Sequence, residues 1–251
     1  MTTSIEIAEF LDQELDINGI EDDSSNGLQV ENTGEIKKIG FAVDACLETF
    51  QQAVEAGCQM LIVHHGLFWN KGKFYLAGIS YNKIKFLLEN NLALYAAHLP
   101  LDLHSQYGNN AQIAKLLNLQ NTEPFGKYHE KVIGIKGELK AAVSIKEIKK
   151  NLEINKIQAL TLPFGKDKIK TIAIISGGAA AEVEEAIHKK ADLYITGEPM
   201  HHVYHMAKES NINVIFGGHY ETEVWGVKAL MSVLKDKFKV NVEFIDVPTL
   251  I

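Results

Sequence analysis

Cysteine and proline are scarce in this sequence, and the usual signatures of covalent catalysis are missing. The 251 residues include two cysteines, Cys46 and Cys58, and five prolines. Such sparse cysteine usage is typical of proteins in a reducing compartment, where disulfides rarely form, so we expect unpaired cysteines in a cytoplasmic protein. Neither cysteine stands beside a histidine, and no G-x-S-x-G segment occurs. The sequence therefore disfavours a covalent nucleophile.

Long apolar runs and an excess of positive charge are missing as well. No uninterrupted apolar segment approaches the roughly 20 residues that a membrane-spanning helix requires. The N-terminal segment MTTSIEIAEFLDQEL reads as an amphipathic helix and not as a signal peptide, because it has early acidic residues and no basic region. The net charge of -7 argues against a general nucleic-acid-binding surface, which normally carries a basic patch. We expect neither a membrane nor a nucleic acid as partner.

The composition that remains is that of a soluble globular protein, with 46% hydrophobic and 23% charged residues. The chain is long enough to bury a large core in one domain or two. In its first half, strand-forming runs alternate with helical ones. This pattern predicts strands over 36–44, 59–63 and 92–98, and helices over 47–56 and 81–89.

The second half repeats the same plan with different residues. It predicts strands over 170–178, 192–196 and 213–219, and helices over 180–190 and 201–209. Strands that alternate with helices indicate an α/β fold with mostly parallel sheets. We therefore predict two pseudo-repeated α/β domains.

A less regular stretch, residues 124–165, lies between the two repeats. It holds the strand-like KVIGIKG and the helix-like SIKEIKKNLE. We place the domain boundary near Gly126, which gives an N-terminal domain over 1–126 and a C-terminal domain over 127–251.

Histidines and carboxylates follow the strand ends in both halves, where α/β folds place their chemistry. They are His64, His65, His98 and Asp102 in the first half, and Glu198, His219 and Glu223 in the second. Neutral imidazoles together with carboxylates suit divalent ions such as zinc, iron, manganese or nickel. The pattern predicts a metal site in a cleft between the two domains.

Five of these residues are strong candidate ligands: His64, His65, Asp102, His219 and Glu223. This is more than one open catalytic ion needs, but enough for two ions that share a carboxylate. Adjacent side chains on an extended backbone point to opposite sides, so the two neighbouring histidines would serve different ions. Two divalent ions about 4 Å apart repel strongly, which calls for a bridging anion. The remaining positive charge favours a small anionic substrate such as a phosphate ester.

These motifs resemble those of a known family. LIVHHGLFW, AHLPLD, ADLYITGE and GGHYETEVWGVKAL, with NGLQV near the N-terminus, are similar in order to the motifs of the Nif-three-like dinuclear-metal family. Members of that family are often labelled GTP cyclohydrolase I type II homologues. The resemblance implies a two-domain α/β subunit with two divalent metal ions between the domains. It also implies a toroidal homohexamer, built as a trimer of dimers.

The resemblance further implies a role for each candidate ligand. His64 and His219 would hold one ion, and His65 and Asp102 would hold the other. Glu223 would bridge both ions.

His98 and Glu198 are candidate catalytic residues, each with a structural alternative. His98 could orient a ligand or shuttle a proton, or it could be a core histidine satisfied by the backbone. Glu198 could act as the general base toward metal-activated water. The alternative is a carboxylate stabilised by the dipole of a helix that begins near Pro199.

Two further motifs favour structural interpretations. His201, His202 and His205 lie on a predicted helix but lack the H-E-x-x-H arrangement, so a solvated or cavity-lining face is the preferred interpretation. SGGAAAE follows a strand like a phosphate-binding turn, yet it has neither the G-x-G-x-x-G spacing nor a Walker lysine. We interpret it as a tight strand-to-helix turn.

The function hypotheses follow from the predicted metal site. The favoured one is a dinuclear metal-dependent hydrolase that acts on a nucleotide or a phosphorylated small molecule. If the family label is taken at face value, the reaction is ring opening of GTP. Phe68, Trp69 and Tyr75 could stack on a purine, but packing in the core or at a subunit interface is preferred. The alternatives are a metal storage or delivery protein without turnover, and a ring-shaped binding scaffold.

Overall fold

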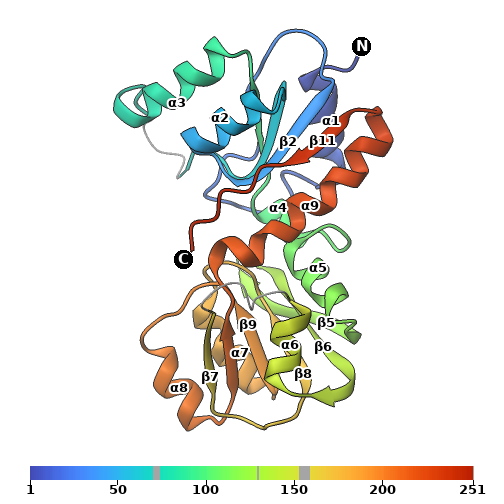
Figure 1. Ribbon diagram of the computed structural model, residues 1–251. Coiled ribbons are helices and arrows are strands. Elements are labelled where there is room, and N and C mark those ends of the chain that lie inside the picture. Colours follow the sequence, from blue (N-terminus) through green and yellow to red (C-terminus); the bar gives the residue numbers. More distant parts are fainter. Residues whose placement is uncertain (70–73, 129, 153–158, 251) are drawn as a thin grey trace. The chain divides into compact units, whose positions relative to one another are not determined.

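The computed structural model describes residues 1–69, 74–128, 130–152 and 159–250. The chain divides into two units, each with a sheet of its own (Figure 1). The first unit comprises Met1–Tyr107 and Gly226–Val247, and the second comprises Gly108–Trp225 and the last residues of the chain.

The first unit is built on a sheet with the strand order β1-β4-β3-β2-β11. β4, β3, β2 and β11 are parallel to one another, and β1 pairs antiparallel with β4 at one edge. The strands are β1 (Gly27–Val30), β2 (Lys38–Asp44), β3 (Met60–His65), β4 (Ala93–Ala96) and β11 (Asn241–Phe244).

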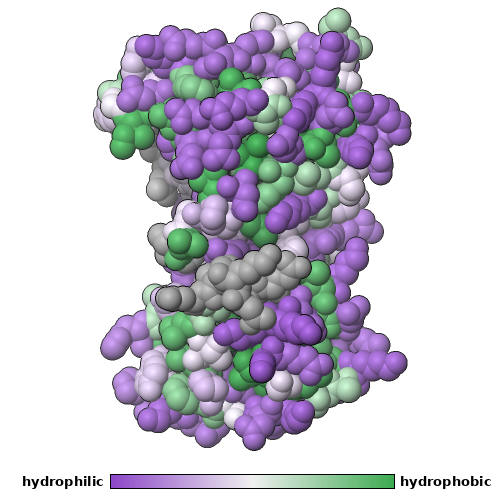
Figure 2. Space-filling model, in the orientation of Figure 1, coloured by the Kyte–Doolittle hydropathy of each residue, from purple (hydrophilic) through white to green (hydrophobic). Residues whose placement is uncertain are grey.

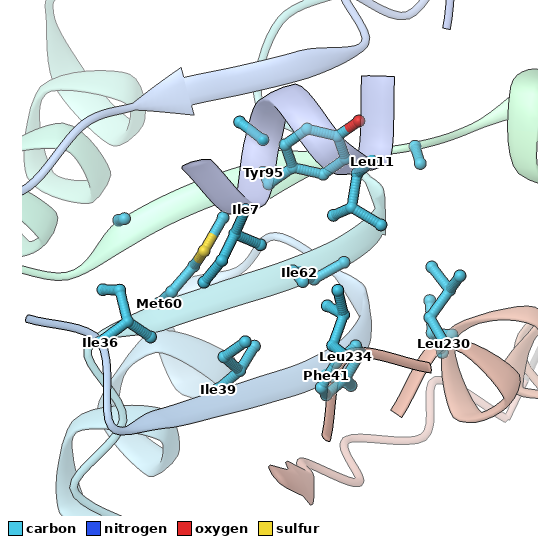
Figure 3. Close-up of a cluster of buried hydrophobic side chains, with 14 of the residues drawn as sticks. Ile7, Leu11, Ile36, Ile39, Phe41, Met60, Ile62, Tyr95, Leu230 and Leu234 are labelled. Carbon is cyan, nitrogen blue, oxygen red and sulfur yellow. The ribbon is translucent and has the colours of Figure 1, made fainter. Parts of the chain in front are cut away.

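Helices cover both faces of this sheet. Because successive side chains on a strand point to opposite faces, Met60 and Ile62 pack against α1 and α9, whereas Leu61 and Val63 pack against α2 and α3. Figure 3 shows Ile7 of α1 on the same face of the sheet as Met60 and Ile62. The helices of this unit are α1 (Ser4–Glu14), α2 (Leu47–Glu55), α3 (Gly78–Glu89), α4 (Leu99–Leu103) and most of α9 (His219–Phe238).

The second unit has a mixed sheet with the strand order β5-β6-β8-β9-β10-β7. β8, β9 and β10 are parallel, whereas β5, β6 and β7 join by antiparallel pairing. The strands are β5 (Gln120–Tyr128), β6 (Lys131–Val143), β7 (Leu160–Pro163), β8 (Ile169–Ile174), β9 (Leu193–Thr196) and β10 (Asn213–Phe216).

Helices again pack on both faces of this sheet. α5 (Asn109–Leu116) and α6 (Ile145–Asn151) contribute to one buried cluster, and α7 (Val183–His188) and α8 (Val203–Glu209) to another. A single turn of 3-10 helix, η2 (Ala180–Glu182), precedes α7. The predicted α/β class is confirmed, although the second sheet is less parallel than expected.

The two units differ from the predicted division at Gly126. β5 contains Gly126 and pairs with β6, so the change of unit comes earlier, after Tyr107. At the other end, β11 pairs in parallel with β2, and Asn241 lies opposite Lys38. Residues 226–247 therefore return to the first unit, and the change of unit falls inside α9, where the sequence shows no break in its helical pattern.

Three strands, β4, β8 and β10, end earlier than the sequence predicts, and two of the differences concern candidate site residues. β4 ends at Ala96, so His98 is the residue just before α4, and β10 ends at Phe216, so His219 is the first residue of α9. Glycines at 217 and 218 end the strand before His219, and Gly218 has a φ of +94°. Within SIKEIKKNLE, α6 is present as predicted, while Glu153 lies outside the described residues.

The α-helices of the described residues range from 5 to 20 residues in length. None of the described helices is both long and apolar enough to span a bilayer. Figure 2 shows hydrophilic side chains over much of the face in view on both units.

The two cysteines lie in different environments, which gives a direct test of the fold. Cys46 is half-buried at the start of α2, whereas Cys58 is buried just before β3, where burial raises the pKa of its thiol to about 11. Since thiolates are the species that react, we predict that iodoacetamide at neutral pH labels Cys46 but not Cys58 in the folded protein. Peptide mass spectrometry before and after unfolding in guanidinium chloride measures this. Equal labelling of both in the native protein would contradict the packing described here.

Candidate metal centre

His64 and His65 form the end of β3, after an apolar run that places them at the carboxyl edge of the first sheet. The Nδ1 atom of His64 lies 2.9 Å from the backbone oxygen of Ala97, and that of His65 lies 2.8 Å from Oδ1 of Asp44. Both partners accept hydrogen bonds, so each ring carries its proton on Nδ1. In a neutral ring this leaves the Nε2 lone pair as the metal-binding atom, the usual arrangement around metal-ligating histidines.

The position of Asp44 follows from the register of the sheet. β2 and β3 are parallel, and Asp44 is the direct partner of His65 where both strands end. Neighbouring strands lie about 4.8 Å apart, so side chains at paired positions on one face are close enough to interact. The register of β2 and β3 therefore brings the Asp44 carboxylate within hydrogen-bond distance of the His65 imidazole.

His98 is held by a small polar network at the start of α4. Its Nδ1 lies 2.9 Å from Oδ1 of Asp22, and its backbone N–H donates to Oδ1 of Asn26 at 2.7 Å. The backbone N–H of Leu99 donates to the other Asp22 oxygen at 3.0 Å. Burial raises the pKa of Asp22, but hydrogen bonds from His98, Asn26 and the backbone outweigh it and lower that pKa to about 2. Asp22 is therefore an ionised, buried acceptor that fixes the His98 ring.

Asp102 lies in the first turn of α4 and is about nine-tenths buried. Its Oδ2 is 3.5 Å from Nε2 of His64. Ligand atoms a few ångströms apart can reach one ion or two neighbouring ions about 4 Å apart, so this separation fits a common metal centre. The ligand atoms that His64, His65 and His98 offer also lie within 4.8 Å of one another. We call His64, His65 and Asp102 the first ligand group, and His98 lies beside it.

The second unit contributes His219 and Glu223, one turn apart on α9, which we call the second ligand group. Nε2 of His219 is 3.0 Å from Oε2 of Glu223, and Nδ1 is 2.6 Å from Oε1 of Glu198. The ring of His219 is thus arranged like that of His64, with an oxygen acceptor at Nδ1 and a carboxylate near Nε2.

Two acidic neighbours control the charge of His219. Burial lowers the pKa of the ring, but Glu223 and then Glu198 outweigh it and raise that pKa to about 9. At neutral pH without metal, the ring therefore carries a second proton, which Nε2 shares with Glu223. A divalent ion binding there must displace this proton, the usual coupling between metal binding and proton release.

Gly177 makes room for the second ligand group. It lies in the SGGAAAE segment, has a φ of +66°, and a Cβ built on it would lie 2.2 Å from Oε1 of Glu223 and 3.4 Å from Nε2 of His219. The segment forms the turn after β8 and continues into η2, in agreement with the structural interpretation. Because Gly177 has no Cβ, it can adopt the left-handed backbone conformation and leave space for the Glu223 carboxylate.

Three histidines near α8 and one glutamate after β9 are further candidates from the sequence. His201, His202 and His205 are exposed at the start of α8. Glu198 follows β9 in a short loop, before α8 begins at Val203, and its contact with His219 indicates that it orients this ring. Its role as a general base stays a prediction.

Sequence reasoning missed Asp22, Asn26 and Asp44. Asp44 had a usable signal, because it ends a buried strand just as His65 does. Asn26 is the first residue of the NGLQV motif, but the motif alone gives it no contact, and Asp22 lies in a loop without any motif. Only the fold brings both residues to His98.

Comparison with known proteins assigns this chain to a family. The family model described as Duf34/NIF3 (NGG1p interacting factor 3) matches residues 2–250. The chain belongs to this family. The resemblance drawn from the HHG, HxPLD and GHxxxE motifs is thereby confirmed.

Curated relatives of this family cover nearly the same length. Proteins from Archaeoglobus fulgidus and Pyrococcus horikoshii are 46% and 48% identical to this chain, each over 97% of the chain and 98% of its own length. Both carry the name GTP cyclohydrolase 1 type 2 homolog.

Solved structures of similar proteins have the same fold. One described as protein ybgI, of unknown function, superposes with a TM-score of 0.91 at 31% identity and full coverage of both chains. Reduced HcgD from Methanocaldococcus jannaschii gives a TM-score of 0.83 at 30% identity over 98% of each chain.

Gly177→Ala tests whether the second ligand group needs a glycine beside it. We predict at least a tenfold loss of zinc affinity, because a methyl group would displace the Glu223 carboxylate. Gly57→Ala is the matched control: Gly57 has a similar φ of +75° but no atom within 4 Å of the added Cβ. Both variants should lose about 1 kcal/mol of stability from the left-handed backbone. Equal zinc affinity in the two variants, measured by competition with a chromophoric chelator, would refute the assignment.

Asp44→Ala tests the hydrogen bond to His65. Removing a carboxylate that orients a ligating histidine costs about 10- to 100-fold in metal affinity, and we predict a zinc-affinity loss in this range. Asp44→Asn keeps an oxygen acceptor for His65 Nδ1 and should therefore recover part of the lost zinc affinity. If the Ala variant binds zinc as tightly as wild type in the same competition assay, His65 is not a ligand held in this way.

Proposed function

We propose that the chain is a metal-dependent hydrolase whose two ligand groups together hold a dinuclear centre. The observation that carries this proposal is the common arrangement of His64, His65 and His219. Each ring has an oxygen acceptor at Nδ1, from its own unit, which directs Nε2 toward a metal. A carboxylate lies near Nε2 of His64 and of His219, so the groups contain the nitrogen and oxygen ligands that zinc, iron, manganese or nickel accept.

For the individual ligands we propose the assignment that the family resemblance implies. His64 and His219 hold one ion, His65 and Asp102 hold the other, and Glu223 bridges them. The approach of Asp102 to His64 and of Glu223 to His219 supports the inclusion of both carboxylates.

Bound divalent ions would supply a positive centre that polarises the scissile group and lowers the pKa of a water molecule. The chain's own residues then handle protons. Asp22 holds the His98 proton at Nδ1, so Nε2 of His98 is the atom that can accept or return a proton. Glu198 holds the His219 ring, which limits its freedom to act as a base elsewhere.

We propose an anionic nucleotide or a related phosphorylated small molecule as substrate. Two carboxylate ligands only partly neutralise two divalent ions, and the residual charge favours an anion. Relatives that cover nearly the whole chain are named GTP cyclohydrolase 1 type 2 homolog, so GTP is the first compound to test. We further propose, from the family resemblance, a homohexamer arranged as a trimer of dimers.

Metal content tests this function most simply. Untagged protein purified without chelators should contain about two divalent ions per chain by elemental analysis, and Glu223→Ala should lose most of both because the bridge is removed. Glu209→Ala, an exposed carboxylate at the end of α8, is the control and should keep both ions. Wild-type protein that takes up no stoichiometric metal even after reloading would overturn the proposal.

Glu198→Ala, which removes the oxygen acceptor as well as the charge, separates the two roles considered for Glu198. If Glu198 orients His219, the variant should bind zinc about 10- to 100-fold more weakly. If Glu198 is instead a general base, zinc affinity should be unchanged while turnover of the substrate falls by about 100-fold or more. We predict the first result, because the 2.6 Å contact already engages the carboxylate.

A further inference from the structure

A hollow of about 180 Å³ lies in the first unit beside the first ligand group. It is smaller than the roughly 300–1,000 Å³ of pockets that enclose whole drug-sized ligands. Its size therefore suits one ring system of a larger molecule. Six of its lining residues are Gly66, Leu67, Trp69, Phe74, Lys83 and Ile84. Gly66 directly follows His65, so the hollow adjoins a candidate metal ligand.

Trp69 is held rigidly in the wall of this hollow. Its indole Nε1–H donates to the backbone oxygen of Gly66 at 2.9 Å, and its backbone forms a β-bridge with Ser24. Its ring meets that of His98 edge-on, with the centroids 5.0 Å apart, and lies 6.0 Å from that of His65. Despite these contacts, Trp69 is 40% exposed. A fixed aromatic surface that remains accessible can stack on a ligand at low entropic cost.

The other lining residues complete a site for a planar, polar ring. Phe74 is exposed and packs edge-on against Phe68, and Ile79 at the start of α3 is 76% exposed. Lys83 donates to the backbone oxygen of Ala45 at 2.8 Å. Because an ammonium group has three donors, Lys83 can also bind an oxygen of a ligand in the hollow.

We propose that this hollow binds the heteroaromatic base of a nucleotide, with Trp69 as the stacking surface and Lys83 as a cationic donor. The apolar and aromatic walls suit the faces of a base, while the phosphate-bearing part extends toward the ligand group at His65. This inference rests on the proposed function for the identity of the site, but base binding can be measured without metal or turnover.

Trp69 itself reports on the proposal. The chain has two tryptophans, so Trp225→Phe leaves Trp69 as the sole source of tryptophan fluorescence. We predict that guanosine 5′-monophosphate quenches this fluorescence saturably, in both the chelator-treated and the zinc-loaded protein. Ribose 5-phosphate, which lacks a base, should leave it unchanged. Stacking of a base on an aromatic side chain has an effect large enough to detect in this way.

A matched pair of substitutions on α3 locates the binding. Ile79→Asp places a carboxylate at the hollow and should weaken nucleotide affinity about tenfold or more. Leu88→Asp introduces the same charge at another exposed position of α3, 62% exposed and outside the lining, and should leave the affinity unchanged. Both variants should keep the zinc content of the parent protein, because neither residue belongs to a ligand group.

The outcomes distinguish this proposal from the proposed function. Absence of quenching, equal binding of ribose 5-phosphate, or equal affinity in the two α3 variants would overturn the base site, even in protein that holds its zinc. Fluorescence that changes with protein concentration but not with nucleotide would show a second copy of the chain on this surface, which also overturns it. If the protein binds no zinc but the nucleotide quenches its Trp69 fluorescence, the base site is supported and the proposed dinuclear hydrolase is overturned.

Discussion

The hydrogen bond from an imidazole Nδ1 to an oxygen acceptor is the interaction on which the candidate site depends. A histidine ring can turn about its bonds and can carry its proton on either nitrogen, so an isolated histidine does not define a metal ligand. In this protein a backbone carbonyl fixes His64, and carboxylates fix His65, His98 and His219. Each acceptor settles the tautomer and the ring orientation together.

The fold supplies these acceptors through the ends of its strands and the turns after them. Asp44 and His65 meet because β2 and β3 are parallel and in register, and Ala97 lies just past β4, the next strand of that sheet. In the second unit, Gly177 follows β8, Glu198 follows β9 and His219 follows β10. Neighbouring parallel strands thus end in the residues that interact, which is why α/β sheets collect polar groups at their carboxyl edges.

The α/β class and the candidate ligands could be predicted from the sequence because both depend on local patterns. Apolar runs that end in glycine or histidine mark strand ends, and HHG, HxPLD and GHxxxE are short motifs with fixed spacing. Long-range pairing could not be predicted in this way. The four-residue β11 has no strong pattern of its own, and it joins β2 across about 200 residues of chain. Asp22 and Asn26 are likewise brought to His98 from more than 70 residues away.

The protonation and metal binding of the histidine rings test the proposed metal centre most directly. Long-range proton–nitrogen NMR of the ring nitrogens, in metal-free and in zinc-loaded protein, reports which nitrogen carries a proton and which binds metal. We expect His64, His65 and His219 to keep their Nδ1 protons on zinc loading, and their Nε2 resonances to shift to metal-bound values, with His219 losing its second proton. Zinc on Nδ1, or Nε2 resonances that stay unchanged when zinc is bound, would contradict the proposed metal centre.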